Sequence, residues 1–236
     1  MHPSHSSSPY AGPSTDAVVI RAGAQDGARA EITRVLRNTY ALLSMTLIFS
    51  AAVAAAAVAL KLPAPGMILT LVGYFGLLFL VHKLQNRAAA LPAVFALTGF
   101  MGYTLGPLLS QVLSLPGGAQ TIAVALGLTG LSFLALSAYV LTTRKDFSFM
   151  GGFLMAGMVV ALLAMLGAVF FEIKALAAVV SGLVALLSVG MLLFETSRIV
   201  NGGERNYVLA TVGLFVSLFN LFTSLLSLLG LGGSNE

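Results

Sequence analysis

Long apolar stretches separated by short polar breaks make up the chain from Val35 onward. A bilayer core about 30 Å thick requires roughly 20 helical residues, and each stretch approaches or exceeds that length. The pattern predicts seven spans, at residues 36–60, 65–83, 88–113, 119–142, 147–171, 175–199 and 206–230. Proline, glycine and charged residues fill the breaks, and Asp146 is placed to cap the fifth helix. The sequence therefore predicts an all-α integral membrane protein with a bundle of seven transmembrane helices.

The first thirty residues have a different character. They are rich in Ser, Pro, Gly and Ala and contain no apolar run. Segments of this kind bury too little apolar surface to offset the entropy of ordering. We therefore expect a disordered tail over residues 1–30, followed by a transmembrane domain over residues 31–236. His2 and His5 lie in this tail and are too few for a metal site.

Composition narrows the function. Hydrophobic residues make up 58% of the chain and charged residues 8%, whereas about a quarter of a soluble domain is charged. This excludes an ordinary soluble enzyme, and a net charge of +4 is too small to suggest nucleic-acid binding. Cysteine is absent, which excludes disulfides and thiolate metal sites. No catalytic triad or phosphate-binding loop is present, so we expect no enzyme activity, no cofactor and no metal.

Basic residues predict the orientation in the membrane. With seven spans, all but two of the twelve Lys and Arg residues fall on one side, the exceptions being Lys61 and Lys174. Positively charged loops favour the cytoplasm. We therefore expect a cytoplasmic N-terminus and a C-terminus on the outer side.

Small residues in the third span predict close helix packing. Gly102 and Gly106 form a GxxxG motif, which allows two helix backbones to approach closely. We expect the motif to pack within the bundle rather than between molecules. Pro107 follows directly, and we expect it to kink the helix and to act as a hinge.

Glu195 is the one clear ionisable residue inside an apolar span. Ser181, Ser188 and Glu195 are seven residues apart and share one helical stripe, which we expect to face the bundle interior. On the last span, Gly213, Ser217, Asn220, Ser224 and Ser227 form a matching seam, which predicts an antiparallel hairpin of the last two helices.

Three roles remain open for Glu195. It could pair with Arg198 at i+3 and reach the interface, act as a buried, titrating gate, or make a structural hydrogen bond. His82 and Lys83 end the second span on the same side. We expect them to be interfacial anchors, with pairing to Glu195 as the alternative.

Several segments resemble one membrane-protein family. They are Phe194-Glu195-Thr196-Ser197, Gly202 to Tyr207, Leu214 to Phe222 running on to Leu228-Leu229-Gly230, Lys145 to Phe149, and Gly102 to Pro107. Together they resemble the Bax-inhibitor family, also called TMBIM or LFG, and most closely its bacterial YccA branch. The resemblance covers nearly the whole chain after the tail.

The resemblance implies two functions. YccA-type proteins are partners of FtsH, a membrane-anchored AAA+ protease, and resist extraction as its slow substrates. It therefore implies a bacterial inner-membrane protein that modulates FtsH, with the tail as the site of engagement. Calcium-leak members carry one aspartate on each of the last two helices. The matching positions here are Glu195 and Ser217, so weak calcium binding and a pH-sensitive cation leak form the alternative.

Overall fold

The computed structural model describes residues 15–232, with side chains described for residues 27–230. Its elements are α1 (Thr15–Ala59), α2 (Met67–Leu84), α3 (Ala90–Leu113), α4 (Gly118–Thr143), a short 3-10 helix η1 (Ser148–Met150), α5 (Gly151–Phe170), α6 (Lys174–Val200) and α7 (Tyr207–Gly232). Seven of these helices are long and apolar enough to cross a membrane. The predicted seven-helix membrane bundle is confirmed, and no strand occurs over residues 15–232.

Helix α1 differs most from the prediction. It runs without interruption from Thr15 to Ala59, so the backbone shows no boundary at residue 30. Residues 15–30 carry no apolar period, but they include Ala17, Ala22, Ala24, Ala28 and Ala30. Alanine has the highest helix propensity, and extending an existing helix costs far less than nucleating one. Residues 1–14 of the predicted tail lie outside the described residues.

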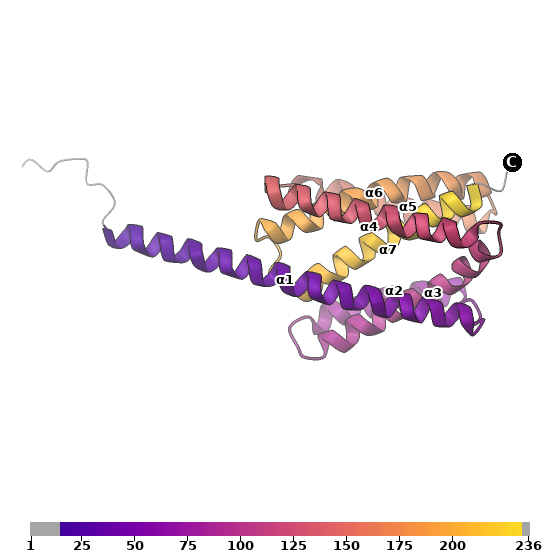
Figure 1. The fold of residues 1–236 in the computed structure, drawn as a ribbon, viewed down its shortest axis with the longest axis horizontal. Coiled ribbons are helices and arrows are strands. Elements are labelled where there is room, and N and C mark those ends of the chain that lie inside the picture. The colour runs from indigo at the N-terminus through magenta and orange to yellow at the C-terminus, as the bar shows by residue number, and fades with distance from the viewer. Residues whose placement is uncertain (1–14, 233–236) are drawn as a thin grey trace, which may run out of the picture.

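Helix α7 lies at the centre of the bundle. It packs against α1, α3, α4 and α6, with its most extensive contact to α6. Figure 1 shows α7, in yellow, crossing between a group formed by α4, α5 and α6 and a group formed by α1, α2 and α3. Phe215 and Leu214 of α7 are fully buried together with Leu192 of α6 and Leu97 of α3. The predicted hairpin of the last two helices is therefore the core of the fold.

Hydrogen bonds join three loops at one end of the bundle. Ser197 Oγ accepts from the Phe147 N–H at 2.9 Å and donates to the Lys145 carbonyl at 3.1 Å, which fixes the α4–α5 loop to α6. Asn206 Nδ2 donates to the Gln85 carbonyl at 3.2 Å, which fixes the α2–α3 loop to the start of α7. These loops carry four of the ten basic residues that predicted this side of the membrane, namely Arg87, Arg144, Lys145 and Arg205.

The GxxxG motif packs α3 against α1. A Cβ at Gly102 would overlap the Ser50 carbonyl oxygen, and a Cβ at Gly106 would lie 2.9 Å from the Ala57 Cβ. The motif therefore serves contacts within the chain, as expected. Pro107 lies inside α3, which continues to Leu113, and its role as a hinge stays a prediction.

Asp146 stabilises the turn that leads into α5. Its Oδ1 accepts the Ser148 N–H at 2.8 Å, so it caps η1 rather than the first turn of α5 itself. Hydrogen bonds from the side chain and backbone of Ser148 hold the pKa of the Asp146 carboxyl below its ordinary value.

Candidate functional site around Glu195

The polar stripe of α6 faces the bundle interior. Ser181, Ser188 and Glu195 are all buried. The two serine hydroxyls donate to carbonyls of their own helix, at Ala177 and Val184. Their hydrogen-bonding capacity is met within α6, so Glu195 is the stripe residue that is left to act on other groups.

Glu195 lies directly against α7. Its side chain is 11% exposed, and a Cβ built on Gly213 would lie 2.7 Å from the Glu195 Cδ. Only a glycine leaves room for the carboxylate at this point of the α6–α7 contact. The predicted seam therefore meets Glu195 at Gly213. Ser217 is also buried, but it lies four residues beyond Gly213 on α7. At a rise of 1.5 Å per residue, this places it about 6 Å farther along the helix.

Arg198 connects Glu195 to the loop before α7. Its Nη1 lies 3.9 Å from Glu195 Oε2, at the i+3 spacing of one of the three roles considered for Glu195. Its Nη2 donates to Glu204 Oε2 at 3.1 Å, a shorter contact that the sequence did not predict. Its guanidinium also lies 5.5 Å from the centre of the Phe194 ring. Arg198 is thus shared between a buried carboxylate and a loop carboxylate.

Glycine geometry brings Glu204 to Arg198. Gly202 has φ of +73°, and the N–H groups of Gly203 and Glu204 both donate to the Arg198 carbonyl. This left-handed turn folds the chain back over the end of α6. An Asn-Gly pair after a helical stretch is the one sequence signal that could have indicated the contact.

Other predicted site residues lie apart from Glu195. His82 and Lys83 are exposed at the end of α2, which packs mainly on α3, and His82 Nδ1 lies 3.3 Å from the Leu78 carbonyl of its own helix. Over the described side chains, neither residue takes part in an ion pair, since both ion pairs found there are made by Arg198. The alternative that they pair with Glu195 is therefore wrong. Asn220 is half-buried, about two turns of α7 beyond Gly213.

The next residue of α6, Thr196, is one of several with a buried hydroxyl group that has no hydrogen-bond partner. Thr196 is fully buried, and its hydroxyl makes no hydrogen bond, nor do those of Thr39, Tyr40 and Ser137. The Ser137 and Thr196 hydroxyls lie beside that of Tyr40, at geometries that form no hydrogen bond. Sequence reasoning missed this group, because its members come from α1, α4 and α6.

The site is suited to holding or moving a charge rather than to covalent chemistry. It combines one buried carboxylate, one partly exposed guanidinium and a loop carboxylate. Over the described residues, no group of three or more His, Asp or Glu side chains could hold a metal ion. Hard cations such as Ca²⁺ favour several oxygen ligands, so Glu195 with Ser217 would make a weak site.

Comparison with known proteins identifies the family. The family model for the inhibitor of apoptosis-promoting Bax1 matches residues 32–235. The chain belongs to this Bax-inhibitor family. A similar protein, "Modulator of FtsH protease YccA" of Escherichia coli K12, is 56% identical over 197 residues, which are 84% of this chain and 90% of that protein. "Inner membrane protein YccA" of Escherichia coli O6:H1 shows the same identity and coverage. A membrane protein of Vibrio cholerae is 44% identical over 207 residues, 87% of this chain and 93% of that protein.

These similarities place the chain in the YccA branch of the Bax-inhibitor family. With its seven apolar helices, it is a multi-pass membrane protein. The relatives' names describe a modulator and membrane proteins, and the absence of enzyme activity in this chain stays a prediction. Each residue of the segment Phe194 to Ser197, which carried part of the family resemblance, contributes to this region. Phe194 supplies the ring under Arg198, and Glu195 supplies the buried carboxylate. Thr196 adds a buried hydroxyl, and Ser197 makes the contact with the α4–α5 loop.

Proposed function

We propose that this protein associates with the FtsH protease in the bacterial inner membrane and modulates its action on other membrane proteins. The observation that carries the proposal is the 56% identity to "Modulator of FtsH protease YccA", which extends over 84% of this chain. The chain is then itself a slow substrate, engaged through its N-terminal segment.

Two structural features support this role. Helix α1 begins at Thr15, and its N-terminal part extends past the other helices in Figure 1, where a protease could reach it. The membrane body is held by a buried core around α7 and by loop hydrogen bonds at one end. A protease that pulled on α1 would therefore meet a well-packed bundle.

The proposal requires a cytoplasmic N-terminus. Because the chain contains no cysteine, single cysteines can be introduced at will. Lys61→Cys and Arg144→Cys lie in loops at the ends of α1 and α4 respectively. In intact cells, a membrane-impermeant maleimide is expected to label the Lys61 variant and not the Arg144 variant. The reverse pattern would remove the geometric basis of the proposal.

Co-purification and turnover test the partner. The tagged full chain is purified from native membranes, and FtsH is expected in the eluate. Replacing residues 2–14 by a Gly/Ser segment of equal length is expected to slow degradation of the chain without unfolding the bundle. A Gly/Ser replacement in the α3–α4 connection, at residues 114–116, controls for general effects of altering a connecting segment on expression. Absence of FtsH from the eluate, together with unchanged turnover, would refute the proposal.

A pH-sensitive cation leak is the second candidate. The observation that favours it is the buried Glu195 carboxylate against α7, beside Arg198. Proteoliposomes containing the purified chain and a calcium dye would show flux that changes with pH and is lost in Glu195→Gln. Flux indifferent to both would exclude this function.

A further inference from the structure

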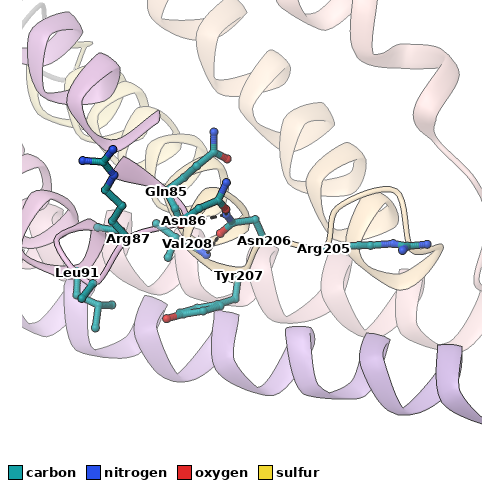
Figure 2. Close-up of a pocket in the computed structure, with 10 residues that line it drawn as sticks. Gln85, Asn86, Arg87, Leu91, Arg205, Asn206, Tyr207 and Val208 are labelled. Atoms are coloured by element: carbon teal, nitrogen blue, oxygen red, sulfur yellow. Dashed lines mark hydrogen bonds between the residues drawn. The ribbon is translucent and has the colours of Figure 1, made fainter. Parts of the chain in front are cut away.

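Two groups of polar residues lie outside the site around Glu195. One lines a cavity of about 530 Å³ between the α2–α3 loop and the first residues of α7. Figure 2 shows its two arginines, Arg87 and Arg205, extending away from each other, so they form no convergent site for a single ligand. The other group consists of three hydroxyls inside the bundle, those of Tyr40, Ser137 and Thr196.

The three hydroxyls are buried and come from three different helices. Tyr40 lies on α1, Ser137 on α4 and Thr196 on α6. Ser137 is 5% exposed and Thr196 is 0% exposed, and all three hydroxyl oxygens are shielded from the surroundings. The Ser137 and Thr196 hydroxyls lie beside that of Tyr40, yet none of the three makes a hydrogen bond to the described part of the chain. Buried polar groups in native proteins nearly always have a partner, which is either a protein group or a water molecule.

Other buried hydroxyls of the bundle are satisfied within their own helices. Thr46 donates to the Leu43 carbonyl at 2.9 Å, and Thr129 donates to the Ala125 carbonyl at 2.7 Å. The ring of Tyr40 carries its hydroxyl away from the backbone of α1, so this solution is closed to it. A bond to α1 itself therefore does not remove the cost of burying the Tyr40 hydroxyl.

The hydroxyls meet where two helices are joined by side chains. Helix α1 packs chiefly on α3 and α7, whereas α4 packs chiefly on α6 and α7. Across the junction of α1 and α4, the rings of Tyr40 and Phe133 lie 5.6 Å apart between their centres. A buried water molecule makes about three hydrogen bonds to groups that otherwise lack partners, which matches three hydroxyls from three helices. Three neutral hydroxyls suit a cation poorly, because hard cations favour more oxygen ligands and negative charge.

We propose that Tyr40, Ser137 and Thr196 bind one buried water molecule, which bridges α1, α4 and α6 inside the membrane. The water would exchange one hydrogen bond with each hydroxyl and would fasten α1 to α4. The proposal depends on the fold of the chain and not on the proposed association with a protease.

A crystal structure of the full chain grown from a lipid phase, at a resolution that shows ordered water, tests the site directly. Wild type is expected to show one water within hydrogen-bonding distance of all three hydroxyl oxygens. The Ser137→Ala/Thr196→Val variant keeps nearly the same shape, and the water is expected to be lost. No water in wild type, direct bonds between the hydroxyls, or a water that persists in the variant would overturn the proposal. Anomalous scattering at this position after soaking in rubidium chloride would overturn it in favour of a cation.

Unfolding in mixed micelles gives a second measurement. Thr196→Val replaces the hydroxyl by a methyl group, and loss of one net hydrogen bond is expected to raise the equilibrium constant for unfolding about fivefold. Tyr40→Phe is expected to act similarly, and the two together should raise the constant by less than the product of their separate effects, because either one alone weakens the same water site.

Thr39→Val is the matched control. Thr39 is fully buried on α1 and its hydroxyl also lacks a hydrogen bond, but successive helical residues project about 100° apart, so it points away from the Tyr40 group. Removing it is expected to leave the unfolding constant unchanged or lower. Equal effects of Thr39→Val and Thr196→Val would refute the proposal. If Thr196→Val does not fold, Ser137→Ala decides, with the same increase expected and an unchanged constant as the refutation.

Discussion

The carboxylate of Glu195 occupies the space that a side chain at Gly213 would need. A Cβ there would lie 2.7 Å from the Glu195 Cδ and 2.8 and 2.9 Å from its two oxygens. The acid of α6 and the glycine of α7 are therefore a complementary pair within the most extensive helix contact in the fold.

Gly213→Ala tests this pair. The added methyl group is expected to displace the carboxylate and to lower the free energy of unfolding by about 1 kcal/mol. In the Glu195→Ala background the same substitution should cost almost nothing, since the space is then empty. The coupling is measured by a double-mutant cycle in mixed-micelle unfolding. Gly182→Ala on α6, where a Cβ meets nothing within 4 Å, is the control.

Gly102→Ala tests the contact of α3 with α1. Its Cβ would overlap a backbone carbonyl of α1, which cannot rotate away, so the helices must separate. We expect a loss of about 1–3 kcal/mol in the free energy of unfolding. Gly127→Ala on α4, where the space is open, should be neutral or slightly stabilising. Equal stability of the two variants would contradict the packing described here.

Arg198 should matter more than Glu204. Glu204→Gln removes a partly exposed pair and is expected to cost about 1 kcal/mol or less. Arg198→Ala also leaves the buried Glu195 without a nearby cation, and we expect about 2 kcal/mol, discounted because the Arg198 side chain is 33% exposed. Adding Glu195→Gln to Arg198→Ala should restore part of the loss. The same unfolding measurement applies, and no restoration would argue against the charge explanation.

Asn206 combines a helix cap with a loop anchor. Asn206→Asp keeps an oxygen for the Val208 N–H but removes the donor to the Gln85 carbonyl, whereas Asn206→Ala removes both. We expect the alanine variant to lose about 1 kcal/mol more than the aspartate variant. Hydrogen exchange should show loosening of the α2–α3 loop in both variants and of the start of α7 only in the alanine variant.

Asp146 gives the α4–α5 junction a pH dependence. Hydrogen bonds from Ser148 lower the pKa of the Asp146 carboxyl in the folded protein. The carboxylate therefore contributes to the stability of the junction above the pKa of the unfolded state, about 4, and this contribution is lost as the pH falls through the folded-state pKa. At pH 7, Asp146→Asn should reduce protection of the Ser148 amide from hydrogen exchange. After correction for intrinsic rates, wild type and variant should converge once the pH has fallen below the folded-state pKa of Asp146. A difference that persists there would contradict the assignment.

The sequence predicts the spans well because each requires only a long apolar run. Interior polar positions such as Ser188 and Glu195 were also predictable, since spacing by seven keeps residues on one face of a helix. The length of α1 was not, because residues 15–30 carry no amphipathic pattern and their helicity continues that of the span that follows.

Pairings between helices were predictable only in part. The seam of α7 was expected to meet α6, but periodicity does not fix the relative depth of two helices, so it could not distinguish Gly213 from Ser217. The Arg198–Glu204 bond depends on the left-handed conformation of Gly202, and the cluster of Tyr40, Ser137 and Thr196 hydroxyls depends on three helices distant in sequence. Both depend on three-dimensional contacts that a one-dimensional pattern does not contain.

Helix α1 packs on α3 and also on α7, while its N-terminal part extends past the other helices and points out of the bundle (Figure 1). A mechanical load applied at that end acts along the helix axis. The contacts with α3 and α7 would then share the load and yield in shear, all together, rather than peel apart one turn at a time. Resistance to extraction would therefore be set by the unfolding rate under force and not by the equilibrium stability of the bundle.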